Sequence, residues 1–546
     1  MPPLSILIWL PAACGLLGAL IPTSAGSGSD EEGRRLSPSG LLTLLGSLAA
    51  FGLAIYFIAE YKPGGGVQNV TDTMWISALG IHYKLGLTGL NVFLVAMTGL
   101  LFSAAILASN LRSSGPPERP RLFFFQMALA ESAVLGAFLA QDLILFVAFF
   151  DLMLIPFYFL IGTWGRDPEG STRVRATIKL VIYTLVGSLL MLAGAVATGV
   201  LSAHGGHADF AYSSLKANPL GTGTQEWIFL LFAAAFLVKM PAFPLHGWMP
   251  DGYRAMPTEV LMVFSGVLSK VGAYGFLAIV LPLFPQAAVH FQTLMLLIAL
   301  VSILYGSMQA FSQTDARLIA GYSSVAQMGF ITLGIFALNP QGAQGALLQM
   351  LNHGLVVAPL LFIVGLLAQR AGGSEDIRQM GGIAFRAPVL ASLFLVVALA
   401  TLAIPGSSNF VGEFLILLGV FKAKLAIAII AFSGVVMASV YALRLFIRAM
   451  HNRVGAGVES FEIAGSDRVV LVPVLSVIVF LALYPQLALH RSEGSVKGAV
   501  GIVSAETGQS SLLASLPAGC HQESAQTTDG HVVTDCTTIF NAAGSE

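Results

Sequence analysis

The stretch Leu231–Gly252, LFAAAFLVKMPAFPLHGWMPDG, decides what kind of protein this is. Eight residues without a polar side chain precede Lys239, and Pro241 and Pro244 follow it. The apolar run is typical of a helix inside a lipid bilayer, where a charged side chain costs about 2.5–3.5 kcal/mol on insertion scales. A lysine retained beside helix-interrupting prolines therefore predicts a buried functional site in a membrane span.

The composition of the whole chain agrees with this interpretation. Of its 546 residues, 56% are hydrophobic and 10% are charged, and the mean hydropathy is +0.82. Soluble domains carry about 25% charged residues, so these values predict a polytopic membrane protein. The net charge of -1 and the lack of a block of Lys and Arg exclude a nucleic-acid partner.

Apolar runs of sufficient length predict an all-α protein with about fourteen transmembrane helices. The predicted spans are residues 3–22, 39–59, 87–109, 121–140, 141–163, 175–201, 227–247, 259–281, 289–310, 316–337, 343–369, 388–422, 424–447 and 468–489. The fourth and fifth spans are separated only by Ala140–Asp142, where Asp142 is expected to cap the next helix. IPGSSN at Ile404–Asn409 interrupts the twelfth span.

The distribution of basic residues predicts the orientation, because cytoplasmic loops carry the excess of Lys and Arg. With the N-terminus outside, the inside loops hold Arg34, Arg35, Arg112, Arg119, Arg121, Arg166, Arg173, Arg175, Arg254, Arg317, Arg370, Arg378, Arg386, Arg448, Arg453 and Arg468. The outside loops hold Lys62, Lys84, Lys216, Lys422 and Lys424. Both ends of the chain are therefore expected outside.

The two ends of the chain and its cysteines allow further predictions. LPAACG around Cys14 resembles a lipoprotein cleavage box, but no Lys or Arg precedes Arg34, so the first span is expected to be retained. Three scattered cysteines cannot hold an iron–sulfur cluster, which takes about four thiolates. The tail after Tyr484 is polar, and Cys520 and Cys536 within it either form a disulfide or remain free thiols.

Five ionisable residues lie inside the predicted spans: Glu131, Asp151, Lys239, Lys270 and Glu413. Such residues usually mark ion pathways, although each of them could instead snorkel to an interface or form a structural pair. Burial disfavours a charged lysine and a nearby carboxylate favours it, so a lysine whose partner approaches and withdraws is a switchable proton site.

Further residues extend this pattern. His353, in LLQMLNHGLVVAPLL, either carries protons or stays neutral and hydrogen-bonded to a neighbouring helix. Pro405 and Gly406 precede Glu413 much as prolines follow Lys239, and paired broken helices are typical of transporters. The broken spans, the seventh and the twelfth, lie five apart. This spacing predicts two inverted five-helix repeats, spans 4–8 and 9–13, because five is odd.

The predicted domains follow from these repeats. They are residues 1–120 with the first three spans, 121–285 and 286–447 with the two repeats, 448–490 with a loop and the last span, and 491–546 as a polar, external tail.

Six motifs carry a resemblance to a known family. They are FFDLMLIPFYFLIG, FLVKMPAFPLHGWMPD, VLSKVGAYG, GYSSVAQMGF, QMLNHGL and IPGSSNFVGEFLIL. From the fourth to the thirteenth span the chain resembles the proton-pumping antiporter-like chain M family of bacterial respiratory complex I (NADH:quinone oxidoreductase), equivalent to mitochondrial subunit 4. Similar chains occur in multisubunit cation/proton antiporters and membrane-bound hydrogenases, but NFVGEF and PLHGWMPD favour the complex I chain.

The resemblance implies a role for each matching residue. Asp151 and Lys239 would form the ion pair of the first half-channel, and Lys270 would be the central relay. His353 would carry protons along the axis, and Glu413 would pass them to the outside.

The resemblance also implies the setting of the chain. Glu131 matches a carboxylate of the fourth span whose role is less defined. NADH, FMN, iron–sulfur clusters and quinone would be bound by other subunits, with no cofactor and no metal in this chain. Its partners would be the lipid bilayer and other membrane-arm subunits, including other antiporter-like chains, in a bacterial inner (plasma) membrane.

The chain departs from the family pattern at several positions. Asp151 replaces the usual Glu, and Gln327 replaces a His, so the central relay would run through water or neighbouring hydroxyls. Tyr253 and Ala255 replace a His and a Glu, and Arg317 replaces a Lys. Two alternatives to a pumping subunit remain: a structural membrane-arm subunit without pumping, and a cation/proton antiporter or one of its subunits.

Overall fold

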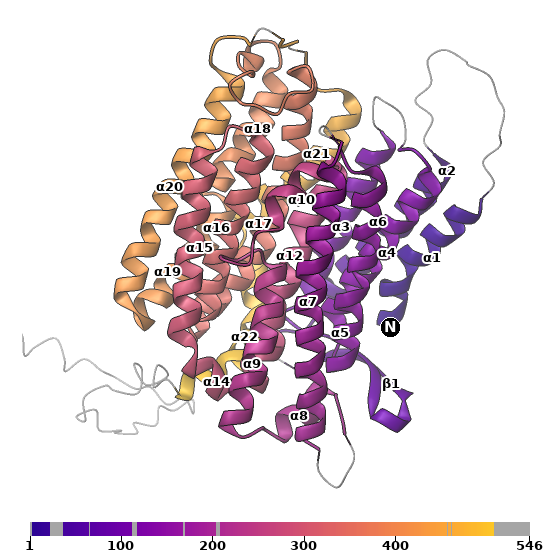
Figure 1. Ribbon diagram of the computed structural model, residues 1–546, viewed down its shortest axis with the longest axis vertical. Helices are drawn as coiled ribbons and strands as arrows, with labels where there is room; N and C mark the ends of the chain where they lie inside the picture. Colours follow the sequence, from indigo (N-terminus) through magenta and orange to yellow (C-terminus); the bar gives the residue numbers. More distant parts are fainter. Residues whose placement is uncertain are drawn as a thin grey trace, which may run out of the picture.

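The structure is a computed structural model that describes residues 3–21, 37–64, 66–111, 117–167, 170–203, 208–455, 457–459 and 461–506. These residues form a bundle of helices along one common axis (Figure 1). Eleven helices of the described part are long and apolar enough to cross a membrane, and shorter apolar helices complete the bundle. The predicted all-α polytopic fold is confirmed. Arg34, Arg35, Arg112, Cys520 and Cys536 lie outside the described residues.

The N-terminal part holds three helices, which the sequence predicts, and a β-hairpin, which it does not. Its elements are α1 (Leu4–Leu20), α2 (Pro38–Glu60), β1 (Gln68–Ile76), η1 (Ser77–Leu79), β2 (Ile81–Leu87) and α3 (Val92–Asn110). The two strands pair antiparallel. Asp72 on β1 lies 2.8 Å from His82 Nδ1 and 3.0 Å from Lys84 Nζ on β2. Partial burial raises the pKa of Asp72, but the bonds with His82 and Lys84 outweigh it and hold that pKa below its usual range.

The first five-span unit contains several interrupted helices. Its elements are α4 (Pro120–Leu139), α5 (Leu143–Leu152), α6 (Leu154–Trp164), α7 (Thr172–Leu201), α8 (Tyr212–Ala217), α9 (Thr222–Lys239), α10 (Met249–Ala255), α11 (Thr258–Val263), η2 (Phe264–Leu268), α12 (Ser269–Gly275), η3 (Phe276–Val280) and α13 (Leu281–Leu283). Asp142 caps α5 as predicted, accepting from Leu145 N at 3.0 Å. The fifth span has a local irregularity at Met153, between α5 and α6, where Pro156 has no N–H to donate to the preceding turn. Leu143–Trp164 still forms one apolar span, as predicted.

The break after α9 is held by specific hydrogen bonds. Lys239, predicted near the middle of a span, is the last residue of α9, because Pro241 and Pro244 prevent the helix from continuing. Trp248 Nε1 donates to Val238 O at 3.0 Å, and Phe243 N donates to Ser302 Oγ on α15 at 3.0 Å. Irregular backbone at this depth is thus satisfied by protein groups.

The second unit and the C-terminal helices follow. Their elements are α14 (Pro285–His290), α15 (Gln292–Ser312), α16 (Ala316–Ile335), α17 (Pro340–Arg370), η4 (Ile383–Phe385), α18 (Pro388–Thr401), α19 (Ser408–Ala423), α20 (Leu425–Met450), α21 (Gly465–Leu483) and α22 (Gln486–Glu506). The predicted interruption of the twelfth span separates α18 from α19.

The two units enter the bundle from opposite ends. At the start of α4, the carbonyl of Glu118 accepts from Trp164 Nε1, and Arg166 nearby pairs with Glu375. At the end of α15, Ala316 N donates to Glu375 O at 2.8 Å. The first unit therefore begins where the first helix of the second unit ends, as an inverted repeat requires.

A buried arginine joins the two units at this end. Arg317, 1% exposed, donates to Met256 O at 2.6 Å and to Thr258 Oγ1 at 3.0 Å. Its Nη2 lies 2.8 Å from Glu375, which also pairs with Arg166. We call these residues the arginine cluster, and the end that they mark the basic end.

The helix α22 joins the units at the hairpin end. It packs against α13, α14 and α17. Gln344 on α17 donates to Leu489 O at 2.6 Å, and Gly89 N, just after β2, donates to Ser495 Oγ at 2.9 Å. Helix α22 extends to Glu506, into the segment that the sequence analysis assigned to a polar tail. Its inward side chains, Val496, Val500 and Val503, are fully buried.

Candidate functional site: a row of buried ionisable groups

The first group lies where α5 and α9 both end. Lys239 is 7% exposed, and its Nζ donates to the carbonyl of Phe150 at 3.4 Å. The same Nζ lies 4.4 Å from the centre of the Phe150 ring, a cation–π distance. The Asp151 carboxyl group interacts with the Ser188 hydroxyl on α7, and its Oδ1 has no partner among the described residues.

The direct ion pair that the resemblance implies between Asp151 and Lys239 is absent. Within the described residues, no carboxylate oxygen lies within 4.0 Å of Lys239 Nζ, although the two groups interact electrostatically. The aspartate side chain is one methylene shorter than a glutamate, so it does not span the gap between the helices. A cavity of about 10 Å³ beside Lys239 and Thr184 has room for about one water molecule.

The second group is Lys270 on α12, which is fully buried. Its Nζ donates to Ser265 O at 2.7 Å and to Ser269 Oγ at 3.2 Å. No ion pair of this lysine with a carboxylate occurs in the described part of the chain. The helix that carries it is π-helical on both sides, in η2 and η3. Such π segments are frequent at functional sites, and the sequence analysis did not predict them.

The third group is His353 on α17, which lies beside the helix of Lys270. A Cβ atom on Gly354 would lie 2.6 Å from Gly266 O, so glycine at this position permits the close approach of α17 and η2. His353 interacts electrostatically with Lys270. Its Nδ1 is buried without a hydrogen-bond partner among the described residues. The ring is therefore free to bind water or to exchange a proton with it.

The fourth group is Glu413 on α19, which is 3% exposed. Its Oε1 accepts from Gln327 Nε2 on α16 at 2.8 Å and from Gln349 Nε2 on α17 at 3.3 Å. Gln349 Nε2 also donates to Gln327 Oε1 at 2.8 Å. We call these three residues the amide triad. Gln327 is thus a direct partner of Glu413, and Gln349 had not been singled out from the sequence.

Unpaired polar atoms surround the break before α19. In the described part of the chain, buried side-chain atoms of Asn352, Ser407, Ser408, Asn409 and Tyr441 have no hydrogen-bond partner. Buried polar groups are nearly always satisfied by protein or water. These atoms are polar groups of α17, α19 and α20 that are able to bind water near this break.

Glu131 lies on α4, which packs against α5 and α12 as well as against the N-terminal helices. It is fully buried, and its Oε1 accepts from Ser47 Oγ on α2 at 2.9 Å. Ser47 Oγ is also 2.9 Å from Ser103 Oγ on α3. The structure thus brings Asp151, Lys239, Lys270, His353 and Glu413 onto successive packed helices and places Glu131 against the N-terminal helices.

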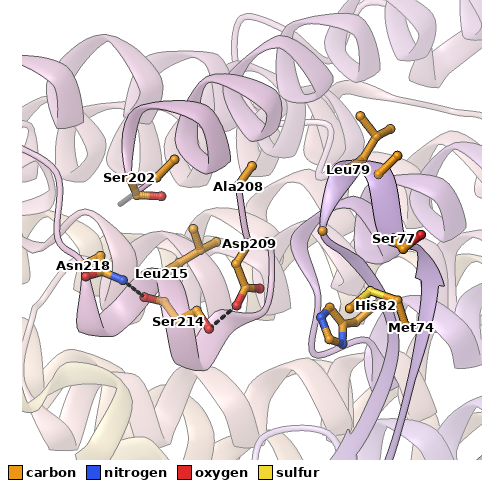
Figure 2. Close-up of a pocket in the computed structure, with 13 residues that line it drawn as sticks. Met74, Ser77, Leu79, His82, Ser202, Ala208, Asp209, Ser214, Leu215 and Asn218 are labelled. Atoms are coloured by element: carbon orange, nitrogen blue, oxygen red, sulfur yellow. Dashed lines mark hydrogen bonds between the residues drawn. The ribbon is translucent and has the colours of Figure 1, made fainter. Parts of the chain in front are cut away.

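A separate cavity of about 500 Å³ opens at the hairpin end, between the β1–β2 hairpin and the segment around α8 (Figure 2). Among its described lining residues are His82, Ser202 and Asp209, and Asp209 bonds to Ser214. The buried ionisable groups do not line it. The sequence analysis had not predicted this cavity.

Comparisons with known proteins agree with this arrangement. The family model described as NADH:quinone oxidoreductase/Mrp antiporter, TM, matches residues 140–439. NADH-quinone oxidoreductase subunit M of Rhodobacter capsulatus is 34% identical over 497 residues, 89% of this chain and 93% of the relative. The Escherichia coli K12 subunit M is 37% identical over 434 residues, 79% and 84% of the two chains.

Solved structures show the same fold. A chain of respiratory complex I from Thermus thermophilus with bound NADH has a TM-score of 0.80 at 30% identity, covering 92% of this chain and 99% of that one. A chain of the Mrp complex from Dietzia has a TM-score of 0.74 at 20% identity, covering 93% and 99%, which is a likeness of fold. Fold and buried groups together define an antiporter-like membrane chain. The chain belongs to the NADH-quinone oxidoreductase subunit M family.

Proposed function

We propose that this chain is a membrane-arm subunit of a respiratory NADH-quinone oxidoreductase and that it translocates protons through its row of buried groups. Membership of the subunit M family supports the assembly. The observation that carries the transport role is that Lys239, Lys270, His353 and Glu413 are all buried on contacting helices. Ionisable residues inside a membrane are costly and are retained mainly for ion pathways.

The contacts of the lysines suggest how protons would move. Neither amine is locked by a direct carboxylate partner, so each can lose or gain a proton without breaking a strong pair. Water in the small cavity beside Lys239 and Thr184 would bring protons to the first amine. Lys270 and His353 would pass them along the axis, and Glu413 would release them into the water near the second break. Glu131 would take part as a further carboxylate of less defined role, because its helix α4 packs against α5 and α12, which carry Asp151 and Lys270.

The proposed setting follows from the family and from charge. We propose a bacterial inner membrane, with the basic end of the bundle inside and the N- and C-termini outside, because basic residues concentrate in cytoplasmic loops. The partners would be other membrane-arm subunits, including other antiporter-like chains. NADH, FMN, iron–sulfur clusters and quinone would be bound by other subunits, which would perform the redox chemistry and drive this chain.

The variant Lys239→Ala tests the proposal in the assembled complex. In inverted membrane vesicles, the pH gradient formed per NADH oxidised should fall to background, because the first amine is removed. The matched control is Lys497→Ala on α22, whose side chain is 60% exposed and pairs with Glu493. It should pump normally. Undiminished pumping by an assembled Lys239→Ala complex would show that the chain is a structural subunit.

A further inference from the structure

The amide triad leaves the two carboxylate oxygens of Glu413 in unequal positions. Oε1 accepts from both amide nitrogens, whereas Oε2 is buried without a partner among the described residues. Gln327 and Gln349 are 2% and 0% exposed, so water does not compete freely for their contacts. In the amide triad, Oε1 of Glu413 is therefore a fixed hydrogen-bond acceptor, and Oε2 is available to exchange a proton.

The orientation of each amide is determined by the other. Gln349 Nε2 lies between Gln327 Oε1 and Glu413 Oε1, and both of these atoms can only accept. A flipped Gln327 would direct its oxygen at the carboxylate and its nitrogen at another donor. The N–H groups of both glutamines therefore point at Glu413 in the only arrangement that satisfies all three contacts.

The packing of α17 on α19 maintains this geometry. A Cβ atom on Gly412 would lie 2.5 Å from Gln349 Oε1, so a larger residue there would push the glutamine away from Glu413. On the other side, the Tyr441 hydroxyl on α20 is buried without a described partner and interacts electrostatically with Glu413. This hydroxyl is available to bind a water molecule that also reaches the carboxyl group.

The chemistry of an amide differs from that of a histidine at this point. An amide N–H donates to a carboxylate in a charge-assisted bond, but the amide does not titrate at physiological pH. A histidine could donate to the same oxygen and also titrate together with it. With two amides as partners, the carboxyl group should exchange protons alone and in a single step.

We propose that Gln327 and Gln349 are positioning residues that stabilise the Glu413 carboxylate through Oε1 and leave Oε2 as its proton-exchanging oxygen. The role of these glutamines in transport rests on the proposed function. Their geometry and the titration behaviour of Glu413 can be tested without measuring transport.

The test is labelling of Glu413 by a hydrophobic carbodiimide, which reacts with protonated carboxyl groups, in the complex assembled in membrane vesicles. Labelling is mapped by peptide mass spectrometry as a function of pH. In Gln327→Met, which keeps the volume but removes the donor, the midpoint of labelling should move to higher pH by about one unit or more. Gln349→Met should shift it in the same direction by less, because its contact is longer.

Two further variants sharpen the test. Gln327→His restores a donor, so the midpoint should return toward the wild-type value, but the labelling curve should now show two steps. Gln344→Met, on the same helix as Gln349 but bonded to Leu489, is the matched control and should leave the midpoint unchanged. If neither methionine variant at the triad assembles, Gln327→Asn, one methylene too short to reach Oε1, should shift the midpoint as Gln327→Met would.

The outcomes separate this inference from the proposed function. An unchanged midpoint in the triad variants would overturn the positioning role, whatever the pumping activity. Normal pumping by Glu413→Gln would overturn the proposed function and leave the labelling result standing. The assignment of Oε2 as the proton-exchanging oxygen is tested with Tyr441→Phe. This variant should lower the number of protons pumped per electron without moving the midpoint of labelling. An unaltered number of protons per electron would refute the assignment.

Discussion

The two units of the bundle hold their buried charges with different neutral groups. In the first unit the amines of Lys239 and Lys270 donate to backbone carbonyls and a serine hydroxyl. In the second unit the carboxylate of Glu413 accepts from two side-chain amides. Dipoles stabilise a charge less than a close counter-ion does, and they do not require a partner to leave when the charge is lost. The comparison shows that the amines of Lys239 and Lys270 face the acceptor ends of neutral dipoles, whereas the carboxyl group of Glu413 faces their donor ends.

The largest expected effect tests whether the two units act in series on one proton path. Lys270→Met and Glu413→Gln should each abolish proton pumping, and the double variant should be no worse, because each removes one step of a single path. The measurement is the pH gradient per NADH oxidised in inverted vesicles. If each single variant kept about half of the pumping, the two units would instead be parallel channels.

The next largest effect, on stability, should come from removing the contacts between the two units at the basic end. Arg317→Ala removes one of the two arginine partners of Glu375 and the donor to the carbonyls of Tyr253 and Met256, and removing one partner of a buried pair costs about 3–5 kcal/mol. The amount of chain in the membrane, measured by immunoblot, should fall several-fold. The control is Arg378→Ala, whose side chain is 68% exposed and pairs only locally with Asp376.

A smaller effect is expected from closing the gap in the first unit. Asp151→Glu adds the methylene that the aspartate lacks, so its carboxylate should reach Lys239, and pumping should stay within about twofold of the wild type. Asp151→Asn removes the charge and should lower pumping by about tenfold, the effect of one pKa unit of lost interaction. Equal pumping by the Asn and wild-type chains would remove Asp151 from the path.

The smallest effect should lie outside both units, at the hairpin. The pKa of Asp72 is held low by His82 and Lys84, so the stabilisation is present at neutral pH and is lost as pH falls below about 4. Because these side chains are partly exposed, Asp72→Asn should cost less than about 1 kcal/mol. Proteolysis of the hairpin in intact complex should increase slightly, with unchanged pumping. A loss of pumping would give the hairpin a role that its charges do not suggest.

The sequence predicts the spans and their interruptions well, because apolar runs and prolines act locally. The break between α18 and α19 follows from IPGSSN, and the cap at Asp142 follows from its place between two runs. The irregularity at Met153 was not predicted, because a single Pro156 in an apolar run is compatible with a continuous span, and Leu143–Trp164 does form one. The hairpin and α22 were missed because neither is apolar enough for a span.

The identities of the buried residues were predictable, but their contacts were not. Lys239, Lys270 and Glu413 stand out in the sequence because charge is rare in a span. Whether Asp151 touches Lys239 depends on the distance between two helices, which one sequence does not contain. From the sequence, Gln327 was interpreted as the loss of a proton carrier. Its hydrogen bond to Glu413 joins residues that are 86 positions apart in the chain, and the sequence alone does not show that they meet.

The two units are in contact at both ends of the bundle, through the arginine cluster at the basic end and through α22 at the hairpin end. Contacts at both ends oppose rocking of the two halves as rigid bodies, the motion by which many carriers expose a site alternately to each side. We therefore expect gating in this chain at mid-depth, where interrupted helices and hydroxyls without a described partner can rearrange while the ends keep their contacts.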